Sequence, residues 1–144
     1  MCSSDLQYKT LAGTWKNRDF DNRATFSFEG GYKPNNKWEF SLRWIIAGGV
    51  PYTPFDIEKS KIVHRAIYDQ SKINDNRYPD YHSMNVRFDR RFHFHNSNIV
   101  FYLSVLNAYD HKNIANYFWN DKEQKPNEVY QWRLLPIFGI EWEF

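Results

Sequence analysis

The chain has 144 residues, a formal charge of +2 and 25% charged residues of mixed sign, so bulk electrostatics give no reason to expect a nucleic-acid partner. Its single cysteine, Cys2, excludes an internal disulfide, and no run of 18 apolar residues is present to form a transmembrane helix. Aromatic residues make up 19% of the chain. That content exceeds what a small soluble core usually needs and is typical of membrane barrels, which carry aromatic girdles at both lipid boundaries.

The first six residues, Met1-Cys2-Ser3-Ser4-Asp5-Leu6, resemble the translation of a common sequencing-adapter end. We therefore expect residues 1–7 to be an artefact joined to a truncated reading frame. Residues 8–144 would then be the C-terminal part of a longer protein. On this interpretation the missing signal peptide carries no information about location.

The next part of the chain alternates strictly between two kinds of side chain, which is the period of a β-strand. In residues 23–32 one face carries Ala24, Phe26, Phe28, Gly30 and Tyr32. In residues 38–46 one face carries Trp38, Phe40, Leu42, Trp44 and Ile46. The turn residues within 33–37 predict that these two strands form a hairpin.

Three more strands are predicted. A long connection precedes the first of them, a short one follows it, and a second long one precedes the last. Gly and Pro end the second strand at residues 48–54, and residues 55–80 are a long polar segment without period two. A third strand begins near Tyr81, a turn occupies 93–98, and a fourth strand covers 99–109 with a bulge at Asn107, where the alternation breaks. A second long polar loop covers 110–128, and the last strand runs over 129–144.

The connections therefore alternate between short and long, as the turns and loops of outer-membrane barrels do. Large apolar residues line one face of every strand. The exception is Arg90, which lies near a turn, where its head group reaches the membrane interface at small cost. We expect an all-β fold: an antiparallel meander of about five long strands, forming a segment of a transmembrane β-barrel.

Four sequence pieces carry a family resemblance. They are residues 49–54 (Gly-Val-Pro-Tyr-Thr-Pro), 77–82 (Arg-Tyr-Pro-Asp-Tyr-His), 104–110 (Ser-Val-Leu-Asn-Ala-Tyr-Asp) and 135–144 (Leu-Pro-Ile-Phe-Gly-Ile-Glu-Trp-Glu-Phe). In this order and spacing, the chain from about Trp15 to Phe144 resembles the end of a TonB-dependent outer-membrane receptor. The alternating Phe138, Ile140, Trp142 and Phe144 resemble the C-terminal signal for outer-membrane insertion. Pro136 departs from that pattern, because it cannot donate to the ladder.

The resemblance implies a barrel of about 22 strands around a plug, located in the bacterial outer membrane. It implies energy-coupled uptake of a large or scarce solute such as an iron chelate, cobalamin or a glycan. Its partners would be membrane lipid, the barrel-insertion machinery, the remaining strands and plug, and the TonB complex through the missing N-terminal part. Five strands cannot close, so this chain alone is expected to transport nothing.

Few residues suggest a more specific site. Tyr117, Phe118 and Trp119 in the second long loop are candidate ligand contacts, because outer loops carry recognition. The five histidines, which include the pair His93 and His95, are expected in a turn and loops, without a metal. Arg87, Asp89 and Arg91 are expected to line a polar lumen. No catalytic motif is present, and neither an enzyme nor a cofactor is predicted.

Three alternatives stay open. A soluble carbohydrate-binding β-sandwich would use the aromatic residues as stacking platforms, but the long polar gaps suit it poorly. A plugless porin would have the same strands. An outer-membrane enzyme barrel would need a catalytic set near its rim.

Overall fold

The computed structural model of this chain describes residues 7–11 and 13–144. The hexapeptide of the expected artefact, Met1–Leu6, lies outside the described residues, and Gln7 is the first residue of a strand. Strands make up 56% of the chain and helices 7%, so the fold is all-β as predicted. The chain forms two compact units, each of which is described by itself. One contains the chain up to Thr25 with Ala47–Tyr81 and Asn113–Gln131, and the other contains Phe26–Ile46, His82–Lys112 and Trp132–Phe144.

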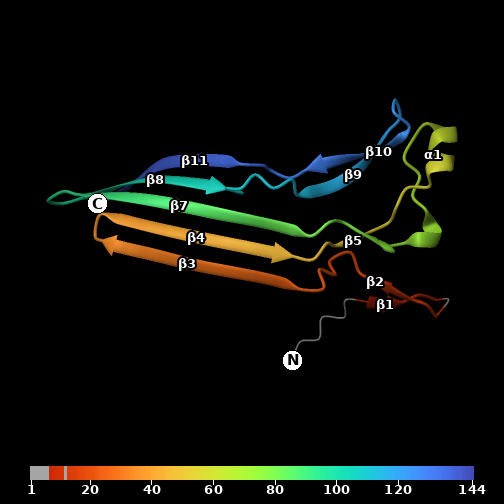
Figure 1. Cartoon of the computed structure of the whole chain (residues 1–144), viewed down its shortest axis with the longest axis horizontal. Helices are drawn as coiled ribbons and strands as arrows, with labels where there is room; N and C mark the ends of the chain where they lie inside the picture. The colour runs from red at the N-terminus through yellow and green to blue at the C-terminus, as the bar shows by residue number, and fades with distance from the viewer. Residues whose placement is uncertain (1–6, 12) are drawn as a thin grey trace. The chain divides into compact units, whose positions relative to one another are not determined.

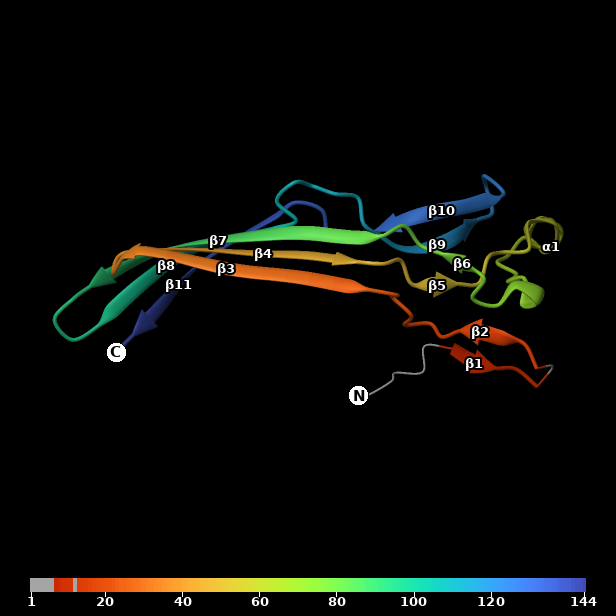
Figure 2. The ribbon, with the colours of Figure 1, turned by 60° about the horizontal axis from the view of Figure 1, so that its bottom comes forward.

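The second unit is a five-stranded antiparallel sheet, which confirms the predicted meander. Its strands are β3 (Thr25–Asn35), β4 (Trp38–Ala47), β7 (Tyr81–His93), β8 (Asn98–Leu106) and β11 (Leu135–Glu143). They lie side by side in the order β11-β8-β7-β4-β3 (Figure 1). Figure 2 shows the twist of this sheet, with β11 oblique to β3.

The register of the sheet places apolar side chains of neighbouring strands opposite one another. Phe88 of β7 lies opposite Leu103 of β8, and Phe101 of β8 lies opposite Ile140 of β11. Because side chains alternate along each strand, this register gathers the large apolar residues on one side of the sheet. Pro136 lies opposite Val105 at the start of β11. That position is on an edge strand, where a missing donor is tolerated.

The first unit contains short elements. It has the strand pairs β1 (Gln7–Lys9) with β2 (Trp15–Asn17), β5 (Pro51–Tyr52) with β6 (Asn76–Arg77), and β9 (Ile114–Asn120) with β10 (Lys125–Tyr130). Helix α1 (Ile57–Val63) begins where the Asp56 carboxylate accepts a bond from the Lys59 amide, and a 3-10 turn covers Gln70–Lys72.

The Gly48-Gly49 pair of the first unit is required by close packing. A Cβ atom on Gly49 would lie 1.7 Å from the carbonyl oxygen of Tyr78. Arg77 donates to the carbonyl oxygens of Asp21 at 2.5 Å and Gly49 at 2.9 Å, and its guanidinium also pairs with the Asp21 carboxylate. This bond with Arg77 is the main reason that the pKa of Asp21 is below its ordinary value.

The structure corrects three sequence predictions. Residues 110–128 are not a featureless loop, because 114–130 form the β9–β10 hairpin. The last strand does not run over 129–144: β10 ends at Tyr130 and β11 begins at Leu135. Asn107 is not a bulge within a strand, since β8 ends at Leu106 and Asn107 begins a turn with a positive φ of 50°.

The same side chains explain the last two differences. The buried Asn107 amide donates to the His111 carbonyl oxygen at 2.8 Å and accepts from the His111 amide at 3.0 Å. Asp110 pairs with Arg133 and accepts from the Leu134 amide at 3.1 Å. These bonds close the chain after β8 and hold the segment before β11 out of a regular strand.

Candidate functional site

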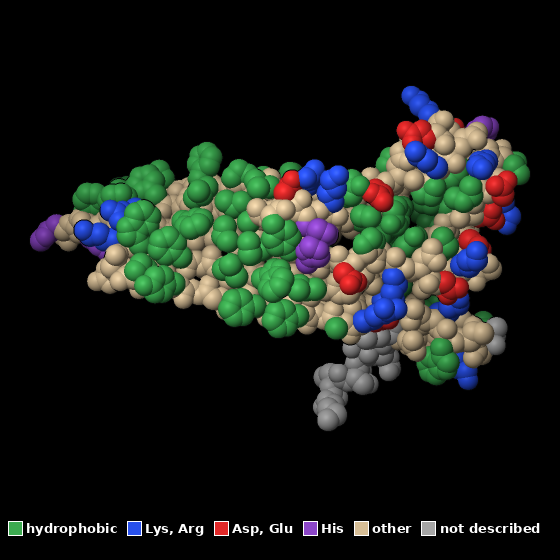
Figure 3. Space-filling model, in the orientation of Figure 1, with side chains coloured by type: hydrophobic (Ala, Val, Ile, Leu, Met, Phe, Trp, Pro, Cys, Tyr) green, Lys and Arg blue, Asp and Glu red, His purple; other side chains and the backbone are tan. Residues whose placement is uncertain are grey.

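The most unusual feature of the sheet is one side on which large apolar residues are open to solvent, here called the apolar face. Its side chains come from all five strands. They are Phe26, Phe28, Tyr32, Trp38, Phe40, Leu42, Trp44, Ile46, Val86, Phe88, Phe92, Ile99, Phe101, Leu103, Val105, Phe138, Ile140 and Trp142. Figure 3 shows hydrophobic side chains covering much of the sheet from one side.

The apolar face is not a protein core. Leu103, on the interior strand β8, is 42% exposed, and Phe138 on the edge strand β11 is 82% exposed. Among the described residues only Ala47 and Val100 are buried hydrophobic residues. Monomeric soluble proteins rarely expose a contiguous apolar patch across a whole sheet, and such patches mark interaction surfaces, so this face is the candidate functional site.

Aromatic contacts organise the face between the strands. The rings of Phe40 and Phe88 meet edge to face at 5.6 Å between centroids, and those of Phe92 and Phe101 do so at the same distance. Edge-to-face pairs of this kind add attraction beyond the buried area. The exposed rings are therefore fixed in place by each other.

One end of the apolar face carries a cation. Arg90 is on the same side of β7 as Phe88 and Phe92, as the sequence predicts. Its guanidinium carbon lies 4.3 Å from the Trp38 ring centroid and 5.3 Å from that of Phe92. The two rings hold this charge at the end of the sheet formed by the short β3–β4 and β7–β8 turns.

The opposite end of the apolar face carries polar aromatic groups. The Trp44 indole donates to the Tyr109 hydroxyl at 3.3 Å, and that hydroxyl also bonds His82 Nδ1 at 2.8 Å. The His82 and His111 ring centroids are 3.5 Å apart. Two imidazoles on one tetrahedral zinc would hold their centroids about 5 Å apart, so this pair, whose ring planes are tilted by 37°, is too close for chelation.

The other side of the sheet, here called the polar face, is lined by ion pairs. Arg87 donates to both oxygens of Asp89, at 2.9 Å and 3.1 Å from Nε, and lies 3.5 Å from Glu141. Two further pairs join neighbouring strands: Arg91 with Glu39 at 3.5 Å and Arg43 with Glu29 at 2.8 Å. The sequence places these charges on one side of each strand, and the structure shows that they pair.

Aromatic packing completes the polar face. The Arg87 guanidinium lies 4.4 Å from the Tyr102 ring centroid. Tyr102 in turn leans over Gly139, where an added Cβ atom would come within 2.5 Å of its hydroxyl oxygen. Val100, on the same side of β8, is 1% exposed. On the interior strands the polar face is thus better covered than the apolar face, which reverses the usual arrangement of a soluble sheet.

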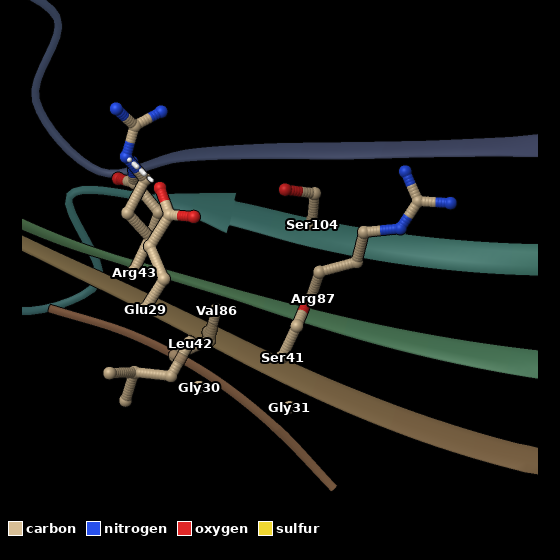
Figure 4. A pocket seen from close by; sticks show the side chains of 10 residues that line it. Glu29, Gly30, Gly31, Ser41, Leu42, Arg43, Val86, Arg87 and Ser104 are labelled. Carbon is tan, nitrogen blue, oxygen red and sulfur yellow. Dashed lines mark ion pairs between the residues drawn. The ribbon is translucent and has the colours of Figure 1, made fainter. Parts of the chain in front are cut away.

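A depression of about 430 Å³ lies over the middle of the sheet, where small residues leave space. Figure 4 shows Glu29, Arg43 and Arg87 on one side of the strands and Leu42 on the other. Both arginines already pair with carboxylates, so the depression contributes hydrogen-bonding polar groups but no free cation.

The structure separates the three candidate ligand contacts of β9. Tyr117 and Trp119 are half-buried: the Tyr117 ring is 5.2 Å from that of Tyr78, and the Trp119 ring is 6.2 Å from that of Phe55. Burial is the main reason that the pKa of Tyr117 is raised. Phe118, between them in the strand, is 45% exposed. Their contact with a ligand stays a prediction. Phe118 is the most exposed of the three and is therefore the most accessible to a ligand.

The residues of the expected insertion signal share one face of the edge strand β11 and its end. Phe138, Ile140 and Trp142 are exposed on the apolar face, and Phe144 follows the strand. Their role in insertion stays a prediction. Sequence reasoning did not single out Trp44, Tyr109 and His82 as a cluster. The period-two pattern extended back to His82 would have placed that residue on the apolar face.

Comparison with family models, curated proteins and solved structures finds no match. In the part of the chain that the structure describes, no group of three or more His, Cys, Asp or Glu residues is placed to hold a metal ion. Among residues 7–11 and 13–144 no helix is long and apolar enough to cross a membrane.

Proposed function

We propose that this chain forms the C-terminal strands of a TonB-dependent outer-membrane receptor, and that its apolar face contacts membrane lipid. The observation that supports this most is the five-stranded sheet, whose large side chains are exposed on one side while its charges are paired on the other. Lipid-facing strands alternate in this way, with apolar residues outward and polar residues toward the lumen.

The dimensions of the sheet fit a bilayer. The 13 residues of β7 span about 43 Å at about 3.3 Å per residue. At the tilt of about 40° usual for barrel strands, this length crosses about 33 Å, more than the apolar band of about 25 Å. Arg90 at one end and the Trp44–Tyr109–His82 cluster at the other are groups suited to the two interfaces.

The edges of the sheet support a place in a larger assembly. The strand order leaves β3 and β11 as the two edges. Unpaired backbone groups are not tolerated in lipid, so on this proposal both edges pair with further strands of a closed barrel. The uptake of a large or scarce solute belongs to that whole receptor, and the family assignment rests on the sequence resemblance.

Labels on adjacent residues of β11 test the orientation. In a Cys2→Ser background, Ile140→Cys and Glu141→Cys place a fluorophore on the apolar and polar faces respectively. In phospholipid vesicles the label at residue 140 should shift to shorter wavelength and be quenched by brominated acyl chains, because it lies in hydrocarbon. The label at residue 141 is the matched control and should respond much less.

The result that contradicts the proposal is equal quenching at both positions, or none at either. A chain that stays monomeric in water without binding vesicles would favour the second candidate, a carbohydrate-binding sheet. The exposed rings of the apolar face are the observation that supports this alternative, since sugars stack on such rings.

A further inference from the structure

The apolar face contains a groove. It is shallow and open to solvent, has a volume of about 410 Å³ and is lined by Phe28, Gly30, Tyr32, Phe40, Leu42 and Phe88, among others. Its floor is Gly30, where an added Cβ atom would meet only the Phe28 ring, at 3.4 Å. A missing side chain in a row of large ones therefore leaves an open apolar channel of the size used by small-molecule ligands.

The guanidinium at the end of this face lacks a carboxylate partner. On the polar face Arg87 pairs with Asp89 and Arg91 pairs with Glu39. Arg90 has no ion pair with any described residue and contacts the rings of Trp38 and Phe92 instead. Its charge is thus fixed in position and available to an anion.

The groove and the cation are continuous. Phe40, a wall of the groove, stacks on Trp38 at 6.1 Å between centroids, and Trp38 is the ring beneath Arg90. Arg90 is two residues, or about 7 Å, along β7 from Phe88, which lines the groove beside Phe40. Lys37 is a second exposed cation, in the adjoining β3–β4 turn. The Lys37 carbonyl oxygen accepts a hydrogen bond from the Arg91 amide at 2.8 Å, which holds this turn beside β7.

We propose that the apolar face binds one anionic phospholipid, with its phosphate on Arg90 and an acyl chain in the groove over Gly30. Along the face, the Arg90 guanidinium is followed by the Trp38 ring and then by the groove over Gly30. A phospholipid has its phosphate, glycerol and acyl chain in the same order. This inference rests on the proposed membrane contact and deepens it, because it names the lipid class and the residues that select it.

Spin-labelled phosphatidylglycerol and phosphatidylcholine, reconstituted separately with the full chain, measure the selection. Electron paramagnetic resonance gives the fraction of each lipid that is motionally restricted by the protein. At low salt, phosphatidylglycerol should associate about five-fold more strongly, the effect of one cation at a membrane surface. Arg90→Gln should reduce this preference to about one, and Arg90→Lys should retain most of it.

Each test position has a matched control at the next residue, on the polar face: Arg91 for Arg90, and Gly31 for Gly30. Arg91→Gln removes a neighbouring cation of the polar face and should leave the preference unchanged. Gly30→Leu fills the groove and should lower the restricted fraction of both lipids. Gly31→Leu should not, because a Cβ atom there points to the polar face and meets its nearest atom, the Phe40 carbonyl oxygen, at 3.7 Å.

The outcomes separate the two proposals. If the wild-type chain restricts both lipids equally, or if Arg91→Gln removes the preference as fully as Arg90→Gln, the phospholipid site is wrong while membrane contact stands. If the wild-type chain restricts neither lipid, the membrane contact itself is wrong and the phospholipid site falls with it.

Discussion

The two faces of the five-stranded sheet share one backbone but differ in how far their side chains are exposed to solvent. On the polar face, long charged side chains pair across strands and cover Val100, which is almost fully buried. On the apolar face, Leu103 lies three residues after Val100 in the same strand and is 42% exposed to solvent. A soluble sheet would bury the second face and leave the first in water.

This difference shows where the sheet obtains its stability. Apolar burial within the sheet is small, so the chain alone gains little from the hydrophobic effect. The polar face contributes hydrogen bonds and ion pairs that hold neighbouring strands in register. The apolar face contributes its ring contacts and gains hydrophobic stabilisation only when another apolar phase covers it. The sheet is therefore expected to depend on its surroundings more than a soluble domain does.

The strongest test of the contrast adds a charge to each face at adjacent positions. Leu42→Arg places a guanidinium in the middle of the apolar face and should destabilise the lipid-bound sheet by about 2–4 kcal/mol, the cost of arginine near a bilayer midplane. Ser41→Arg, one residue earlier, is on the polar face and should cost much less. Urea unfolding in phospholipid vesicles, monitored by tryptophan fluorescence, measures both.

Equal costs for Leu42→Arg and Ser41→Arg would mean that both faces meet the same medium. A smaller cost at residue 42 than at residue 41 would reverse our assignment of the faces. The comparison is sharp because the two residues belong to one strand and have the same neighbouring strands.

A smaller effect is expected from breaking the ion pairs of the polar face. Asp89 is buried and accepts bonds from Arg87 at 2.7 Å from Nη2 and 2.9 Å from Nε, so Asp89→Ala should destabilise the sheet by about 1–2 kcal/mol. The pair of Arg43 and Glu29 is mostly exposed, and Glu29→Ala should cost less than about 1 kcal/mol.

Salt separates these two pairs further. Unfolding measured at low and high salt should show the contribution of Glu29 disappearing, because exposed charges are screened. The contribution of Asp89 should persist. Identical salt dependence for the two variants would contradict the view that the polar face shields its central charges.

Much of this contrast could be predicted from the sequence, because strand parity is a local property. Phe40 and Leu42 alternate with Glu39 and Ser41, and such alternation fixes which side chains share a face without knowledge of the partner strands. The same pattern placed Arg90 correctly among apolar residues. The strand ends at Asn35, Ala47 and His93 also agree with the predicted boundaries to within a few residues.

The features that escaped prediction depend on contacts between distant residues. Tyr117 and Trp119 lie in a hairpin whose second strand, Lys125–Tyr130, is polar enough to resemble a loop, and their rings pack on Tyr78 and Phe55 far away in sequence. The groove at Gly30 exists because three strands bring large side chains around a glycine. A glycine in a strand pattern is a weak signal for such a space, since it also marks bulges.

The smallest predicted effect concerns the boundary between the irregular segment and β11. The pKa of Asp110 is below its ordinary value of 3.8, first because its carboxylate accepts from the Leu134 amide and second because it pairs with Arg133. A depressed pKa in the folded chain means that the contact stabilises fully above pH 3.8 and is lost as the pH falls through the lower folded value.

The Leu134 amide reports this contact directly. Its proton resonance in the lipid-bound chain should move as the pH falls through the folded pKa of Asp110, which lies below the ordinary value of 3.8, because Asp110 then takes up a proton and the bond weakens. Asp110→Asn should remove that pH dependence, and Asp21→Asn, which changes a carboxylate in the other unit, should leave it intact. If Leu134 titrates unchanged in the Asp110→Asn chain, a different group holds this segment. The boundary of β11 would then be set by the sheet itself, through the register of Leu135 with Leu106, and not by the turn after β8.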